Sequence, residues 1–155
     1  MNTMISAVTN GGFRKSTNNK AIEFGSQPPG ELVRLLRHHA DDIWAPPSQG
    51  PAAPLTDVLV HTQDIVRPLG IEVVVAPAEV DPALTFCVSP KSNQLFVHQR
   101  RLKGLRLEPN DLKWKFGKGE LLEGSSMEVL LAILGRRDSL PHLTGPGVEV
   151  LAARI

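Results

Sequence analysis

The sequence predicts an α+β fold, in which helices fill residues 1–98 and a small sheet packs on helices in residues 99–155. In the first part, apolar residues recur every three or four positions, which is the period of amphipathic helices. In the second part, the stretches GLRLE, LKWKF and ELLEG alternate apolar and polar residues and are separated by the turns PND and GKG. A chain of 155 residues that is 41% hydrophobic can bury one core, so we expect one domain or a domain with a small lobe.

Three helices are expected in the first part, near residues 12–25, 29–44 and 55–67. The second has a proline pair on each side, and its apolar residues follow the helical period. The third ends by Arg67, because Pro68 disfavours helical geometry at the residue before it and Gly70 completes the break. The stretch DPALTFCV, residues 81–88, is expected to form a turn or a short helix.

A β-hairpin is expected between Gly104 and Gly124, built from two or three antiparallel strands. Alternation places three apolar side chains on one face of the middle strand, with lysines on the other: Leu112, Trp114 and Phe116. A capping box at Ser125 starts a helix over residues 126–136, which Trp114 is expected to contact. The apolar spacing over residues 148–155 predicts a last short helix.

Composition limits the classes of partner and compartment. A formal net charge of +1 predicts that the molecule as a whole has no obligate polyanionic partner. No stretch is apolar over the length that a signal peptide or a membrane-spanning helix needs, so we expect a cytoplasmic protein without a membrane partner. The single cysteine, Cys87, cannot form an intramolecular disulfide, and its neighbours Phe86 and Val88 predict a packed core thiol instead of a nucleophile.

Basic residues are concentrated in one segment, residues 91–118, which holds eight lysines and arginines against two acids. The segments on either side are mildly acidic. One interpretation is a solvated linker and sheet face, and the other is a surface that binds an anion such as phosphate, a carboxylated substrate or nucleic acid. Two aromatics in this segment, Trp114 and Phe116, are too few to predict base stacking, which makes nucleic acid the least favoured of these ligands.

The stretch PLTDVLVHTQDIVRPLG, residues 54–70, carries a candidate metal site. A helical wheel places six residues on one broad apolar face: Leu55, Val58, Leu59, Thr62, Ile65 and Val66. Opposite this face, Asp57 and His61 are four residues apart and can offer a carboxylate oxygen and an imidazole nitrogen to one divalent ion. Asp64 can orient the imidazole through its other nitrogen, and Arg67 is expected to hold Asp64 in place. A stripe of polar residues such as Asp57, His61 and Asp64 is also typical of the solvated face of an ordinary surface helix.

The core of this stretch, V-x-V-H-x-Q-D-I-x-R-P-L-G, resembles the signature of the mycothiol-dependent maleylpyruvate isomerase family of DinB-like metalloproteins. The second part of the chain is similar to that family in the order of its motifs. A G-L-R-L strand, a tryptophan strand and a G-x-G turn precede a leucine-rich helix that ends in Gly-Arg. The resemblance extends from about Gly11 to the end of the chain.

This resemblance implies a DinB-like four-helix bundle that holds a divalent metal, zinc, often followed by a small α/β lobe. Residues 1–98 would form part of the bundle and residues 99–155 the lobe. Family members bind the metal through a histidine on an early helix and through a pair at i and i+4, on which Asp57 and His61 fall. The resemblance further implies an isomerase or transferase in which the metal activates the thiol of mycothiol for addition to a small electrophilic substrate.

The tryptophan-to-histidine motif of the early helix has no counterpart in this sequence, so we expect a chain shortened at its N-terminus, with part of the bundle and one metal ligand missing. Residues 1–155 should then bind metal weakly or not at all, and the chain should be less stable than a complete bundle or self-associate through bundle faces. Val58, Leu59 and Val66 are the side chains expected to be partly uncovered. The alternative is a non-catalytic module that binds a partner or an anionic ligand.

Overall fold

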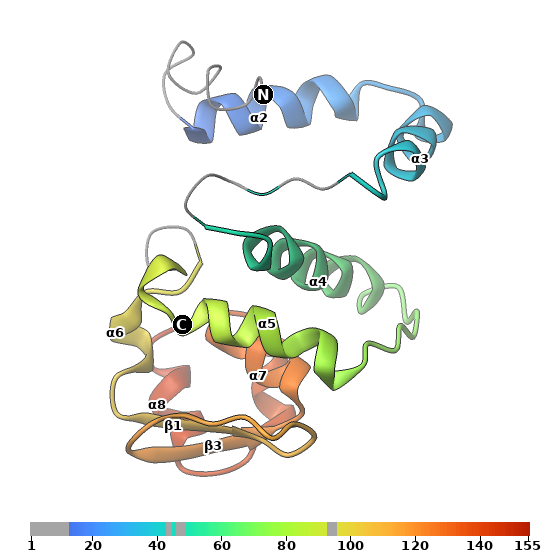
Figure 1. Cartoon of the computed structure of the whole chain (residues 1–155). Helices are drawn as coiled ribbons and strands as arrows, with labels where there is room; N and C mark the ends of the chain where they lie inside the picture. Colours follow the sequence, from blue (N-terminus) through green and yellow to red (C-terminus); the bar gives the residue numbers. More distant parts are fainter. Residues whose placement is uncertain (1–12, 43–44, 46–48, 93–95) are drawn as a thin grey trace. The chain divides into compact units, whose positions relative to one another are not determined.

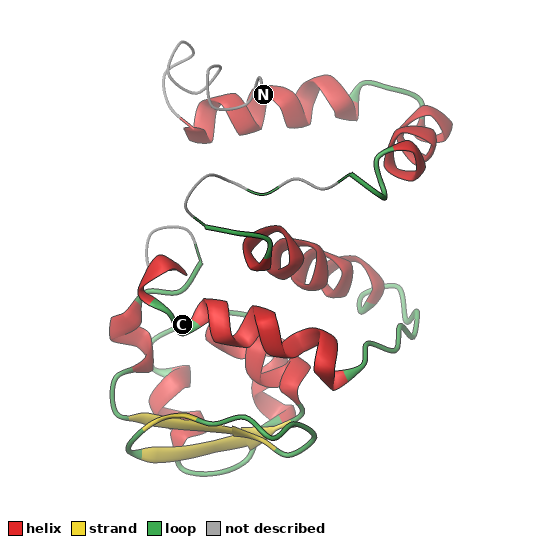
Figure 2. Ribbon diagram, viewed as in Figure 1, coloured by secondary structure: helices red, strands yellow, loops and turns green. Residues whose placement is uncertain are grey.

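The computed structural model describes residues 13–42, 45, 49–92 and 96–155 (Figure 1). The chain divides into two compact units, an N-terminal unit of residues 1–43 and a C-terminal unit of residues 44–155. Helices dominate the described residues, and a three-stranded sheet lies in the C-terminal unit (Figure 2), which confirms the predicted α+β class. The sequence placed a boundary between residues 98 and 99, whereas the contacts in the structure group residues 44–98 with the sheet.

The N-terminal unit contains α2 (Phe13–Gly25) and α3 (Pro29–His38), close to the first two predicted helices. Helix α3 ends six residues before the predicted end, in a turn where the His39 ring lies 2.7 Å from the carboxylate of Asp42. The last two residues of the predicted helix, 43 and 44, lie outside the described residues. No side chain of α3 is buried.

Helix α4 (Ala52–Val66) begins three residues earlier than predicted. Pro54 falls in its first turn, where the absent N–H group has no helical partner to lose. Helix α5 (Pro77–Cys87) is longer than the turn or short helix expected there. It continues through Pro82 because burial of three apolar side chains on one face favours the helix: Val80, Ala83 and Leu84.

The sheet consists of β1 (Leu105–Pro109), β2 (Phe116–Gly117) and β3 (Glu120–Gly124), in the order β2-β1-β3. Strand β2 is antiparallel to β1, as the predicted hairpin requires. Strand β3 is parallel to β1, so the prediction of an entirely antiparallel sheet was wrong. Most of the LKWKF stretch is also outside the strands, since only its last residue belongs to β2.

The parallel pairing depends on how the GKG stretch crosses the start of β1. The N–H of Glu120 donates to the carbonyl oxygen of Gly104, 2.9 Å away, immediately before β1. Gly117 and Gly119 both have positive φ, at 80° and 132°. A Cβ atom at Gly119 would lie only 2.2 Å from the Gly104 carbonyl oxygen, so the crossing requires glycine. The stretch therefore carries the chain across β1 instead of closing a hairpin.

Helix α7 (Ser126–Ile133) starts at the predicted cap, where the Ser125 hydroxyl accepts a hydrogen bond from the N–H of Glu128. It ends three residues before the predicted end, near Gly135, which has a φ of 96°. The short 3₁₀ helix η2 (Arg137–His142) and α8 (Gly147–Ala152) follow, and α8 matches the predicted last helix. Two further short elements are η1 (Pro90–Ser92) and α6 (Gln99–Leu102).

The core of the C-terminal unit lies where α7 and α8 separate α5 from the sheet (Figure 1). Both helices contact β1 and β3, and α4 packs on α5. The predicted alternation is confirmed, because Trp114 and its two partners pack on the core while Lys113 and Lys115 are exposed. The Trp114 indole N–H donates to the hydroxyl of Thr85 on α5, at 3.0 Å, and its contact with α7 stays a prediction. Among the described helices, none has the length and apolar character to cross a membrane.

Cys87 is fully buried at the end of α5, as predicted. Burial raises the pKa of its thiol to about 12, against a smaller opposing effect of a hydrogen bond with Thr56. The raised pKa keeps the thiol protonated at pH 8, and the thiolate is the reactive form. We therefore expect the folded protein to react with dithiobis(nitrobenzoate) roughly a thousandfold more slowly than the chain unfolded in guanidinium chloride. Rapid labelling of the folded protein would contradict the packed position of this thiol.

Candidate metal centre

Helix α4 buries a different face from the one that the wheel predicted. Its buried side chains are Ala53, Thr56, Leu59, Val60 and Gln63. Val58 and Ile65, which the sequence placed on the apolar face, are 64% and 62% exposed. Of the three side chains expected to be partly uncovered, Val58 is exposed, Val66 is half-buried and Leu59 is buried, so the prediction for Leu59 was wrong.

Two polar residues can lie on the buried face because each has a hydrogen-bond partner within α4 or just after it. The Thr56 hydroxyl donates to the carbonyl oxygen of Ala52 at 2.7 Å. The Gln63 side-chain oxygen accepts a hydrogen bond from Nε of Arg67 at 3.0 Å. Satisfied polar groups cost little to bury, so α5 can pack on this face of α4 and leave Val58 and Ile65 in solvent.

The predicted stripe lies on one side of α4, with the His61 ring between two carboxylates. His61 Nε2 lies 3.4 Å from Oδ1 of Asp57, and Nδ1 lies 3.0 Å from Oδ2 of Asp64. The side chains of His61 and Asp57 are 60% and 62% exposed, while that of Asp64 is 35% exposed. The stripe is therefore open to solvent at Asp57 and His61 and partly covered at Asp64.

Arg136, which follows α7, holds Asp64 from the other side. Its Nε and Nη2 atoms donate to the two oxygens of Asp64, at 3.1 and 2.6 Å. The Arg136 guanidinium holds the pKa of this carboxyl below its ordinary value, and the hydrogen bond from His61 adds to the effect against the opposing effect of burial. Asp64 is therefore a charged and fixed acceptor for the His61 ring at neutral pH.

The predicted pair of Arg67 with Asp64 was wrong. Arg67 points to the buried face of α4, where its Nη2 and Nη1 atoms donate to the carboxylate of Glu128 on α7, at 2.6 and 3.2 Å. Nη1 also lies 3.4 Å from the hydroxyl of Ser139 in η2. Arg67 thus ties α4 to α7 and η2 instead of orienting the stripe.

Sequence reasoning missed Arg136 as the residue that holds Asp64. The two residues are 72 positions apart, and their pairing depends on how α4 packs beside the end of α7. Gly-Arg-Arg at the end of a leucine-rich helix was visible in the sequence, but a basic helix end has many possible partners.

A third metal ligand is not evident in the part of the chain that the structure describes. There, no three side chains of histidine, cysteine, aspartate or glutamate are grouped so as to hold a metal ion. His98 and His142 are exposed elsewhere on the C-terminal unit, and His39 of the N-terminal unit pairs with Asp42. Within the described residues, the candidate site therefore consists of the Asp57 and His61 pair with Asp64 and Arg136 behind it.

Comparisons of the chain with protein-family models, with curated proteins and with solved structures find no match. The resemblance to mycothiol-dependent maleylpyruvate isomerases stays an expectation that rests on the sequence motifs.

Proposed function

We propose that the chain is related to the mycothiol-dependent maleylpyruvate isomerase family and carries two ligands of a divalent metal site, Asp57 and His61. The observation that carries the proposal is the 3.4 Å approach of His61 Nε2 to the Asp57 carboxylate while Nδ1 faces Asp64. The proposal places the protein in the cytoplasm, with a small thiol and an electrophilic small molecule as its ligands.

The two contacts of the His61 ring explain why this arrangement suits a cation. A neutral imidazole has one N–H group, and Asp64 is the better placed acceptor because Arg136 holds it. In the tautomer whose N–H group faces Asp64, the lone pair of Nε2 would face an oxygen of Asp57. Two acceptors at this distance favour a cation between them, and zinc binds both imidazole nitrogen and carboxylate oxygen.

The chain's own residues would then have distinct tasks. His61 and Asp57 bind the ion, and the negative charge of Asp57 lowers the net charge of the site. Asp64 fixes the ring of His61 and raises the basicity of its free nitrogen, as carboxylates behind metal-binding histidines do. Arg136 positions Asp64 and keeps it ionised. A bound zinc ion would supply a lowered thiol pKa, which makes the thiolate of mycothiol available as a nucleophile.

Zinc titration by calorimetry tests this proposal. We expect the chain to bind zinc more weakly than a site with three or four protein ligands, because only two ligands lie together on α4. His61→Ala should abolish binding, and Asp64→Asn should weaken it about tenfold by releasing the ring. His39→Ala is the matched control, because His39 also pairs with an exposed aspartate three residues away yet lies outside the stripe.

The thiol part of the proposal needs its own measurement. Cobalt(II) in place of zinc should give thiolate-to-metal charge-transfer absorption when mycothiol is added to the wild-type chain, and His61→Ala should remove this band. If His61→Ala and the wild-type chain bind zinc equally, the stripe is a solvated helix face.

A non-catalytic binding module is the alternative function. The observation that favours it is the exposure of Val58 and Ile65 beside the stripe, since monomeric proteins usually cover such side chains when they adjoin one another. Association of chains through this face stays a prediction. Zinc binding that is lost in His61→Ala favours the first proposal. Equal zinc affinity, or no zinc binding, in the wild-type chain and in His61→Ala favours the alternative.

A further inference from the structure

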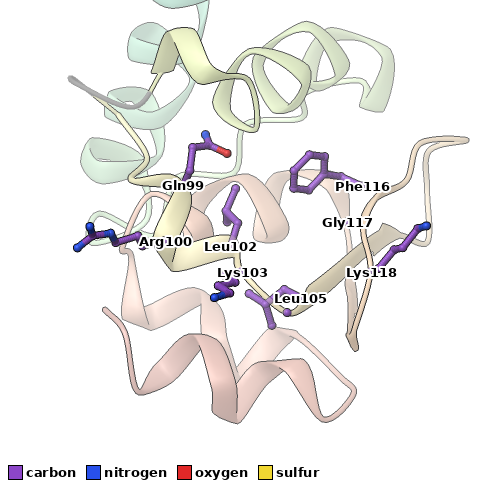
Figure 3. Close-up of a pocket in the computed structure, with 9 residues that line it drawn as sticks. Gln99, Arg100, Leu102, Lys103, Leu105, Phe116, Gly117 and Lys118 are labelled. Atoms are coloured by element: carbon purple, nitrogen blue, oxygen red, sulfur yellow. The ribbon is translucent and has the colours of Figure 1, made fainter.

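A hollow of about 450 Å³ lies between α6 and β2, on the basic segment of residues 91–118 (Figure 3). Its apolar lining is the half-buried ring of Phe116 of β2, together with Leu102 of α6 and Leu105 of β1, whose side chains are buried. Figure 3 shows Leu102 and Phe116 on opposite sides of the same space. Hollows of this size accept small organic molecules, and apolar walls provide most of the contact area in such sites.

Three cationic side chains surround this apolar surface: Arg100, Lys103 and Lys118. All three are exposed, and in Figure 3 the side chains of Arg100 and Lys118 extend away from each other at the two ends of the hollow. Among the residues that line it, none is acidic. Cations without a neighbouring acid give the rim of the hollow a positive potential, which attracts anions and repels cations.

The basic side chains at this rim differ from others in the segment because they form no ion pair or hydrogen bond with any residue that the structure describes. The Arg101 guanidinium donates to the carbonyl oxygen of Ile133 at 2.8 Å. Arg106 and Lys115 both pair with Glu108. In the described part of the chain, five basic side chains of the segment form no ion pair or hydrogen bond: Lys91, Arg100, Lys103, Lys113 and Lys118. Three of these five line the hollow.

We propose that this hollow binds a small organic carboxylate with an apolar body. The apolar body would lie against the half-buried ring of Phe116, and the carboxylate would lie at the rim, within reach of Lys103 or Lys118. Surrounding charge selects an anion and the apolar wall selects against simple inorganic ions, because these gain nothing from apolar contact. The site is separate from the Asp57 and His61 pair and does not rest on the function proposed for that pair.

Amide chemical-shift titration of the ¹⁵N-labelled full chain with 1-naphthoate tests the proposal. The amide signals of Gly104 and Gly117, which line the hollow, should shift and saturate, while that of Gly70 should not. Uncharged 1-naphthalenemethanol, which has the same ring system, should bind at least about tenfold more weakly, since it lacks the charge contacts. No saturable shift at Gly104 and Gly117, or equal affinity for the two compounds, would overturn the proposal.

Two double variants separate a built site from general electrostatic attraction. Lys103→Gln/Lys118→Gln should weaken 1-naphthoate about tenfold, while Lys103→Arg/Lys118→Arg should bind it as the wild-type chain does. Lys91→Gln/Lys113→Gln removes the same charge from the same segment outside the hollow and should leave the affinity unchanged. Equal weakening in both glutamine variants would show that net charge alone attracts the ligand and would reject the site.

Discussion

Gly119→Ala is expected to destabilise the C-terminal unit by about 3 kcal/mol, measured by urea unfolding. The φ of 132° at this residue disfavours any side chain, and the new Cβ atom would lie 2.2 Å from the backbone carbonyl of Gly104. A backbone oxygen cannot rotate away as a side chain can. The chain would have to move where it crosses β1, and this movement would disturb the parallel pairing of β1 with β3.

Gly104→Ala is the matched control, because it also places alanine at a positive φ, 72°, at the same crossing. Its Cβ atom would meet nothing within 4 Å, so we expect only the backbone cost of about 1 kcal/mol. Equal effects of the two substitutions would mean that the close approach at Gly119 does not exist and that β3 reaches its place by another path.

Arg67→Met is expected to cost about 2 kcal/mol of unfolding free energy. The substitution leaves the carboxylate of Glu128 without the guanidinium that binds both of its oxygens. Breaking a fully buried ion pair costs about 3–5 kcal/mol, and the smaller figure expected here allows for the 26% and 16% exposure of the two side chains. Arg67→Met/Glu128→Met should recover most of the loss, since two apolar side chains of similar size leave no unpaired charge.

Lys115→Met supplies the control for an exposed pair. Lys115 contacts Glu108 at 2.9 Å, but its side chain is 75% exposed, so the substitution should cost no more than about 0.5 kcal/mol. If Arg67→Met is no more costly than Lys115→Met, or if the double variant does not recover stability, then α4 is not held to α7 through this pair.

The elements that the sequence predicted well are those with local signals. The end of α4 follows from Pro68 and Gly70, and the start of α7 follows from the hydroxyl of Ser125. The burial of Cys87 follows from the apolar residues on both sides of it. For the candidate site, the i, i+4 spacing was sufficient to place Asp57 and His61 on one side of a helix, because helix geometry alone brings them together.

Tertiary structure decided which face of α4 is buried. The sequence offered an apolar face that includes Val58 and Ile65, but α4 packs on α5 and buries the face of Thr56 and Gln63. The helical period of the sequence identifies an apolar face. It does not determine which face of the helix packs on a neighbouring helix, since polar groups that have hydrogen-bond partners can also be buried. The same packing directs Arg67 toward α7.

The parallel pairing of β1 with β3 and the bond from Arg136 to Asp64 were also decided only by the fold. Alternating apolar and polar residues predict strands, but the order and direction of the strands depend on the path between them. That path passes through Gly119 across the start of β1. The sequence by itself thus determined the helix boundaries that have local signals and the His61 stripe, and the tertiary structure determined their partners, because pairing depends on contacts between residues far apart in the chain.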